Sequence, residues 1–174
     1  RRPTTTKTRV VGQRQQMVRI DRERTDRVRG PLLKAILARA SELIPRVDGV
    51  IVEDYGKGLI HPGLLKPVIS LAKRCGKVIA VDPKEEHFGM YKNLRLTTIT
   101  PNRKETENAI RNIKINDSRS NLNIYNDKIN TDREIDLAGR ELLRYLNCES
   151  VLITLGERGM RLFEDNGKIT HIDT

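Results

Sequence analysis

The chain has 174 residues, of which 32% are charged and 37% hydrophobic. This length supports one domain with its own core, and no apolar run approaches the roughly 18 residues that cross a bilayer. Because the N-terminus also lacks the apolar segment of a secretory signal, we expect a cytoplasmic protein without a membrane span. Cys75 and Cys148 stand outside any CxxC pair and predict reduced core thiols, and the three histidines show no metal-ligand spacing.

The net charge of +10 is concentrated at the N-terminus, because residues 1–29 hold ten Lys or Arg against three Asp or Glu. A basic arm can bind nucleic acid. However, four Tyr, two Phe and no Trp leave few rings to stack on bases, and no recognition motif is present. We therefore expect an anionic metabolite as the partner and not a nucleic acid; a steep salt dependence of DNA or RNA binding would reverse this expectation.

The N-terminal segment alternates between β-branched and polar residues. Residues 5–11 and 15–20, with Gly12 between them, predict a β-hairpin with one solvent-facing side. The next residues carry an apolar stripe at helical spacing. They predict a helix over residues 30–44, with Pro31 in its first turn.

Short apolar runs then alternate with amphipathic segments. Residues 49–54, 77–82 and 96–100 predict strands, the first two buried on both faces, and residues 61–76 predict a helix between the first two. This alternation is typical of βαβ units. It predicts a three-layer α/β fold with a mainly parallel sheet and helices on both faces.

The second half repeats this alternation after a polar interruption. Residues 111–130 are Asn-rich without clear periodicity and predict a loop or insertion. Residues 131–147 predict a helix, residues 150–155 a buried strand, and the remainder a hairpin that turns at an Asn-Gly pair. We expect a single partial domain over residues 1–174, with a basic hairpin before residue 30 and an α/β core after it.

The carboxyl ends of the predicted strands carry polar residues and glycines, and ligands bind at these ends in open parallel sheets. Glycines let backbone amides approach an anion, lysines supply positive charge, and carboxylates can hold Mg²⁺ directly or through water. This combination fits phosphoryl transfer, which depends on positioning and charge neutralisation. The residues concerned are Asp54, Gly56, Lys57, Asp82, Lys84, Asn102, Glu105, Thr154, Gly156 and Gly159.

Each of these features also has a purely structural interpretation. Asn102 and Glu105 have the spacing of a helix capping box, and the Asp-Pro pair at 82–83 is turn-prone. Gly156 and Gly159 can simply shape the path into the C-terminal hairpin, and the Asp and Lys after the first apolar strand can form a surface ion pair. Neither a GxxxxGK[ST] nor a GxGxxG motif is present, so we expect neither a P-loop nor a dinucleotide site.

Five segments, in this order and spacing, resemble the ribokinase-type carbohydrate kinases and, within them, the heptose 7-phosphate kinases. The segments are KTRVVGQRQQMVRIDRE, VEDYGKGLI, VDPK, TITPNRKE and VLITLGERGM. The resemblance runs from about Pro3 to Thr174. It implies transfer of the γ-phosphate of ATP, with Mg²⁺, to the anomeric hydroxyl of D-glycero-β-D-manno-heptose 7-phosphate, in ADP-heptose and lipopolysaccharide biosynthesis.

The resemblance also implies roles for residues on the nucleotide side. Asn102 and Glu105 match the family's Asn-x-x-Glu motif, which organises Mg²⁺, its waters and the nucleotide phosphates. Thr154, Gly156 and Gly159 match the turn that binds the nucleotide.

On the substrate side, the resemblance implies two groups of residues. One group follows the first apolar strand and would lie near the sugar or the phosphates. The other lies on the hairpin, which resembles the family's lid and would either meet the 7-phosphate or form homodimer contacts. The first group consists of Asp54, Gly56 and Lys57, and the second of Lys7, Arg9 and Arg19.

Two motifs of the family are not found among these residues. The sugar-binding region with Gly-Gly and Asn/Asp motifs is expected before Arg1, and the Gly-Ala-Gly-Asp motif with the catalytic aspartate is expected after Thr174. We therefore expect no catalytic base and no turnover in this chain alone. The alternatives are another ribokinase-type sugar kinase and a non-catalytic domain that binds a sugar phosphate or a nucleotide.

Overall fold

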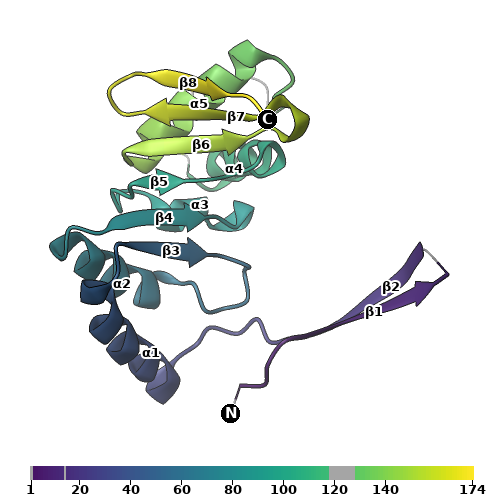
Figure 1. The fold of residues 1–174 in the computed structure, drawn as a ribbon, viewed down its shortest axis with the longest axis vertical. Helices are drawn as coiled ribbons and strands as arrows, with labels where there is room; N and C mark the ends of the chain where they lie inside the picture. Colours follow the sequence, from purple (N-terminus) through teal and green to yellow (C-terminus); the bar gives the residue numbers. More distant parts are fainter. Residues whose placement is uncertain (1, 14, 118–127) are drawn as a thin grey trace.

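The computed structural model describes all residues except 1, 14 and 118–127. A two-stranded hairpin stands apart from a six-stranded sheet with its helices, and the two termini lie far apart (Figure 1). The strands are β1 (Thr6–Gly12), β2 (Gln15–Arg22), β3 (Gly49–Glu53), β4 (Val78–Asp82), β5 (Thr98–Ile99), β6 (Ser150–Thr154), β7 (Met160–Glu164) and β8 (Ile169–Ile172). The α-helices are α1 (Gly30–Leu43), α2 (Pro62–Arg74), α3 (Phe88–Tyr91), α4 (Arg103–Asn116) and α5 (Asp132–Leu146).

The large sheet has the strand order β3-β4-β5-β6-β7-β8. Strands β3 to β6 are parallel, whereas β7 and β8 return as an antiparallel hairpin. The predicted α/β fold with a mainly parallel sheet is therefore confirmed, as is the separate N-terminal hairpin.

One face of the sheet carries the core. Val52, Val81, Ile99, Val151 and Phe163 are successive cross-strand partners, and each is buried. They share one hydrophobic cluster with residues of α2, α3, α4 and α5, so these helices cover this face.

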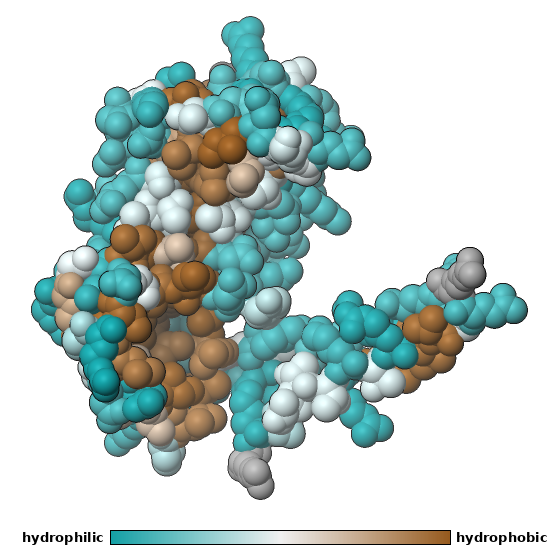
Figure 2. All heavy atoms as spheres, viewed as in Figure 1, coloured by the Kyte–Doolittle hydropathy of each residue, from teal (hydrophilic) through white to brown (hydrophobic). Residues whose placement is uncertain are grey.

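The opposite face of the sheet is not covered by the described residues, although the sequence predicts helices on both faces. Ile51 and Val78 point to this side and are 72% and 54% exposed. Figure 2 shows apolar atoms running across the sheet on the face turned to the viewer.

The hairpin departs from its prediction in one respect. The sequence predicts one solvent-facing side, but every described residue of β1 and β2 except Asp21 is exposed. The prediction is wrong because the hairpin packs on no other part of the described chain beyond its base.

The predicted loop over residues 111–130 is wrong at its start. Helix α4 continues to Asn116, because Ile110 and Ile113 extend its buried stripe. Ile129, in the same predicted loop, is 1% exposed. Residues 118–127 of that loop lie outside the described residues.

Some local features were not predicted. Helix α3 and the 3₁₀ turns Glu85–His87 and Gly156–Arg158 do not follow from the sequence pattern, and β5 has only two residues. No helix in the described ranges has the length and apolar character needed to cross a membrane. Cys148 is buried, as predicted.

Candidate functional site

The chain segments that follow the parallel strands continue side by side at one edge of the sheet. The amide of Asp54 donates to the Asp82 carbonyl over 3.0 Å, and the amide of Thr154 donates to the Pro101 carbonyl over 3.0 Å. Asn102 and Thr154 form an isolated parallel bridge. The structure thus brings the predicted strand-end residues to one edge, as expected for parallel strands.

Asn102 and Glu105 form a capping box at the start of α4. The Glu105 amide donates to Asn102 Oδ1 over 2.9 Å, and the Asn102 amide donates to Glu105 Oε2 over 2.8 Å. The structural interpretation of this pair is therefore confirmed. It leaves Glu105 Oε1 and Asn102 Nδ2 without a partner among the described residues, and the first turn of α4 presents free amides to the same edge.

The turn after β6 places two glycines with different surroundings. Gly156 and Gly159 have φ angles of 62° and 72°. A Cβ at Gly159 would lie 2.0 Å from the Ile172 carbonyl oxygen, so Gly159 is required by the close approach of β8. A Cβ at Gly156 would meet nothing within 4 Å, so a ligand has room to approach the backbone there.

Asp54, at the end of β3, is a buried carboxylate with three donors. Its Oδ1 accepts the Gly56 amide over 2.9 Å, and its Oδ2 accepts the Tyr91 hydroxyl over 2.6 Å and lies 2.7 Å from His87 Nδ1. Burial, followed by the hydrogen bond to Asp54, raises the pKa of Tyr91 well above its ordinary value. The carboxylate therefore joins the turn after β3 to residues 87–91 and is not a surface partner of Lys57.

His87 and Tyr91 are the residues of this network that the sequence analysis missed. They lie 33 and 37 residues after Asp54 in the chain. No motif or spacing predicts such a contact, because it depends on how residues 87–91 pack against the end of β3.

A cavity of about 420 Å³ separates the base of the hairpin from the end of β3. Its charged lining consists of Lys7, Glu23, Glu53, Asp54 and Lys57. Tyr55, Leu59 and Ile60 add apolar surface.

Only some of the predicted substrate-side residues line this cavity. Lys7, Asp54 and Lys57 line it together, and Lys57 forms an ion pair with Glu23. Arg9 and Arg19 do not line it; they face each other further along the hairpin, where Arg19 Nε lies 3.0 Å from Asp21 Oδ1. Gly56 adopts a φ of 66° beside the Lys84 side chain.

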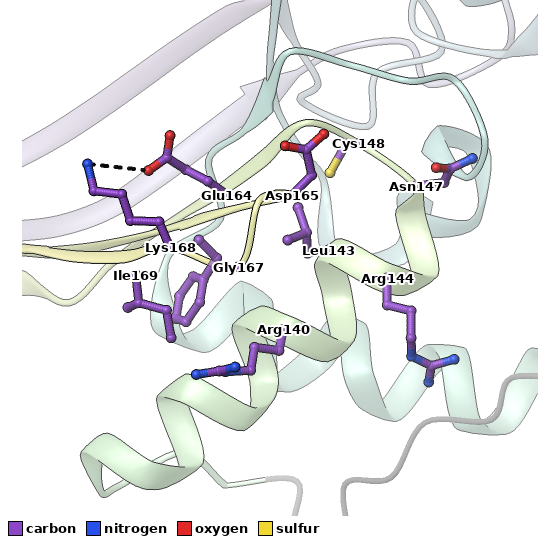
Figure 3. Close-up of a pocket in the computed structure, with 11 residues that line it drawn as sticks. Arg140, Leu143, Arg144, Asn147, Cys148, Glu164, Asp165, Gly167, Lys168 and Ile169 are labelled. Atoms are coloured by element: carbon purple, nitrogen blue, oxygen red, sulfur yellow. Dashed lines mark ion pairs between the residues drawn. The ribbon is translucent and has the colours of Figure 1, made fainter.

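A second hollow, of about 350 Å³, lies at the opposite edge of the sheet, between the end of α5 and the β7–β8 turn (Figure 3). Arg140 and Lys168 face it, and Lys168 lies 3.9 Å from Glu164. None of the predicted site residues lines this hollow, so we assign it no role.

The described parts of the chain contain no group of three or more His, Cys, Asp or Glu residues that could hold a metal ion. A metal at the strand-end edge would therefore be held by few protein atoms together with waters or ligand oxygens. The oxygen atoms of Asn102 and Glu105 are of the type that Mg²⁺ prefers, so they fit such a role.

Comparisons with curated proteins give relatives that are named bifunctional protein HldE. No protein-family model matches the chain. The chain is 39% identical over 162 residues to the bifunctional protein HldE of Desulfatibacillum aliphaticivorans, and 35% identical over 173 residues to that of Geotalea uraniireducens. These alignments cover 93% and 99% of this chain but 30% and 32% of the relatives. The chain therefore spans about a third of the length of the curated relatives that it matches.

Solved structures with the same fold include a ribokinase and a phosphofructokinase-2. Ribokinase of Arabidopsis thaliana, complexed with ribose and ATP, matches 78% of this chain and 38% of its own with a TM-score of 0.55 at 16% identity. Phosphofructokinase-2 of Escherichia coli, in complex with fructose-6-phosphate, matches 84% of this chain and 43% of its own with a TM-score of 0.56 at 14% identity. The chain is therefore homologous, over nearly its whole length, to a segment that makes up about one third of each of these HldE proteins. It has the fold of the ribokinase-type carbohydrate kinases.

Proposed function

We propose that this chain forms the phosphate-binding and metal-binding part of a cytoplasmic carbohydrate kinase. The reaction is transfer of the γ-phosphate of ATP to the anomeric hydroxyl of D-glycero-β-D-manno-heptose 7-phosphate, which gives the 1,7-bisphosphate for ADP-heptose synthesis. One observation carries the proposal: the first turn of α4 and the open Gly156 turn lie side by side at the carboxyl edge, joined by the Asn102–Thr154 bridge. Both present backbone amides to an anion.

The nucleotide phosphates and Mg²⁺ belong at this edge in the proposal. Glu105 Oε1 and the Asn102 side chain would contact the metal ion through water, and the metal would neutralise charge on the phosphates. Thr154, Gly156 and Gly159 would shape the backbone around the nucleotide.

The sugar phosphate belongs in the cavity beneath the hairpin. Lys7, which is paired with Asp21 over 3.3 Å, and Lys57, which is paired with Glu23, supply positive charge for the 7-phosphate. The ring of Tyr55 and the side chain of Leu59 suit the carbon skeleton of a sugar. Arg9 and Arg19 would reach the phosphate only if the hairpin moved toward the sheet.

The assay that tests the proposed function measures ADP release, with the 174-residue chain and the product of the complete reading frame in parallel. We expect the complete product to release ADP with heptose 7-phosphate and the chain alone to release none, because the family's catalytic aspartate is expected outside these residues. Release by the chain alone would contradict the expectation that the catalytic aspartate lies outside these residues. A preference of the complete product for ribose or fructose 6-phosphate would favour another sugar kinase, and ATP binding without turnover would favour a binding domain.

We also propose that the hairpin mediates homodimer formation. Val10 and Val18 are cross-strand partners, Ile20 follows on the same face of the hairpin, and these side chains are 45%, 48% and 51% exposed. An exposed apolar strip on a two-stranded hairpin is stabilised when another chain covers it.

A further inference from the structure

A basic hollow of about 470 Å³ lies at the edge of the sheet where β4 and β5 begin, away from the carboxyl edge that carries the candidate site. Its charged lining consists of Lys73, Lys77, Arg95 and Glu149. We propose that this hollow is a second anion-binding site, which takes a phosphate group that is either free or carried by a small metabolite. The inference goes beyond the proposed function and does not depend on it.

The end of α2 brings two of the cations to the hollow. The Lys77 amide donates to the Ala72 carbonyl over 2.9 Å. The amide of Gly76, which has a φ of 65°, donates to the Lys73 carbonyl over 2.9 Å. These two bonds form a Schellman motif, which ends the helix and satisfies carbonyls that would otherwise repel an anion. The turn therefore holds both lysines at the hollow and reduces the negative potential of the helix end.

Arg95 has a backbone conformation that residues other than glycine rarely adopt, with a φ of 46°. Its neighbours fix this conformation. The Leu94 carbonyl accepts a hydrogen bond from Lys73 Nζ, and the carbonyl of the buried Leu96 accepts one from the Glu149 amide over 2.9 Å. Glycine would avoid the strain, but it would not supply a guanidinium, which donates two parallel hydrogen bonds to phosphate oxygens. Strain of this kind is typical of functional sites.

The positive charge of the hollow is not neutralised within the described chain. The side chains of Lys77 and Arg95 form no hydrogen bond or ion pair with any described residue. Burial and, after it, the charge of Arg95 lower the pKa of Lys73, whereas the Glu149 carboxylate raises it. Lys73 and Arg95 therefore repel each other, and an anion between them would replace this repulsion with attraction.

The lining favours a phosphate group on a small molecule. Three cations against one carboxylate suit an anion with more than one negative charge, and a phosphate monoester carries about 1.5–2 charges at pH 7. The volume of the hollow is typical of small-molecule sites. Among the described residues that line it there is no aromatic side chain, so the bases of a nucleic acid would have no ring to stack on.

Lysine acetylation tests the site directly in the product of the complete reading frame. The protein is treated with acetic anhydride, with and without pyrophosphate, and the rate at each lysine is measured by mass spectrometry. We expect pyrophosphate to slow the acetylation of Lys73 and Lys77 severalfold, because a bound anion covers both amines. Lys66 is the control, since it is an exposed lysine of α2 that does not line the hollow, and its rate should not change. Inorganic phosphate and ADP, tested in the same way, distinguish a free phosphate group from a nucleotide.

Variants then identify the groups that bind the anion. Arg95→Gly should raise the pyrophosphate concentration for half-maximal protection about 10-fold without lowering the Tm, because it removes the guanidinium and also the strain. Glu149→Gln should lower that concentration about threefold, because a repelling charge is lost. Arg74→Ala is the matched control, since Arg74 is an exposed cation of α2 that contacts Ser70 and does not line the hollow. It should stay within about twofold of the wild type.

A second variant, Lys77→Gln, is measured by the acetylation of Lys73 and keeps the test decisive if Arg95→Gly does not fold. It should also weaken the protection about 10-fold. The inference is overturned if none of the three phosphate compounds slows acetylation of Lys73 and Lys77, or if Lys77→Gln leaves the protection unchanged. Protection by oligo(dT) but by no small phosphate compound also overturns it and assigns the hollow to nucleic acid. None of these readings requires phosphoryl transfer, so the inference and the proposed kinase function fail separately.

Discussion

At the scale of single residues, Asp54 shows how far sequence reasoning reaches. Its place after an apolar strand identifies it as a candidate site residue, and it does line the cavity. Its partners could not be predicted, because His87 and Tyr91 come from a distant segment whose packing no local pattern reveals. Glu23 was missed for the same reason: its contact with Lys57 spans 34 residues.

Removing the hydroxyl of Tyr91 should measurably destabilise the fold. We expect Tyr91→Phe to lower the free energy of unfolding by about 1–3 kcal/mol, because a buried carboxylate loses a donor. Tyr145→Phe is the matched control, since the Tyr145 hydroxyl contacts Asp117 over 3.2 Å at a less buried place; its cost should be about 1 kcal/mol or less. Urea denaturation measures both, and equal losses would contradict the importance assigned to the Asp54 network.

The two cysteines should differ in reactivity. Burial raises the pKa of the Cys148 thiol from 9.0 to about 12, so almost no thiolate forms at pH 8 in the folded protein. Iodoacetamide at pH 8 should therefore modify the half-buried Cys75 in the native protein and both cysteines in urea, as mass spectrometry can detect. Native modification of Cys148 at the same rate as Cys75 would contradict its burial.

At the scale of elements, the bounds of α1, α2 and α5 were predicted to within two residues, whereas only the start of α4 was predicted. The Asn102–Glu105 spacing predicted the first turn of α4, because a capping box is local. The end of α4 was misplaced, since the Asn-rich composition after Ala109 concealed an apolar stripe that tertiary packing buries. The two-residue strand β5 and the short helix α3 are likewise set by neighbours and not by their own propensity.

The contact between the hairpin base and the turn after β3 can be tested at one glycine. Gly58→Ala should lower the free energy of unfolding by about 3 kcal/mol or more, because a Cβ would collide with the Asp26 carbonyl. Gly167→Ala has a similar positive φ but nothing within 4 Å, and should cost only about 1–2 kcal/mol. Equal losses in thermal or urea denaturation would mean that backbone strain alone, and not the contact, requires glycine at 58.

At the scale of the whole molecule, the alternation of strands and helices was sufficient to predict the α/β class. The alternation could not predict which faces of the sheet are covered. An apolar strand sequence indicates that both faces are buried, but it does not specify which helices cover them. The sequence likewise could not predict the burial of the hairpin, because both of its faces are exposed in the described chain.

The oligomeric state distinguishes the two exposed apolar surfaces. If the hairpin forms the homodimer, Val18→Glu should yield monomers in analytical ultracentrifugation, since it places a charge in the apolar strip. Ile51→Glu introduces the same charge on the open sheet face and should leave the dimer intact. Loss of the dimer in Ile51→Glu but not in Val18→Glu would assign the interface to the sheet.

The most direct test of the central claim compares two capping boxes of the same geometry. Glu105 caps α4 at the proposed phosphate site, and Glu134 caps α5 in the same way without an assigned ligand. Glu105→Gln and Glu134→Gln should each cost about 0.5–1 kcal/mol of stability. In the product of the complete reading frame, only Glu105→Gln should lower kcat and raise the Mg²⁺ concentration for half-maximal activity. Identical kinetics for the two variants would contradict the account and leave Asn102 and Glu105 as a helix cap.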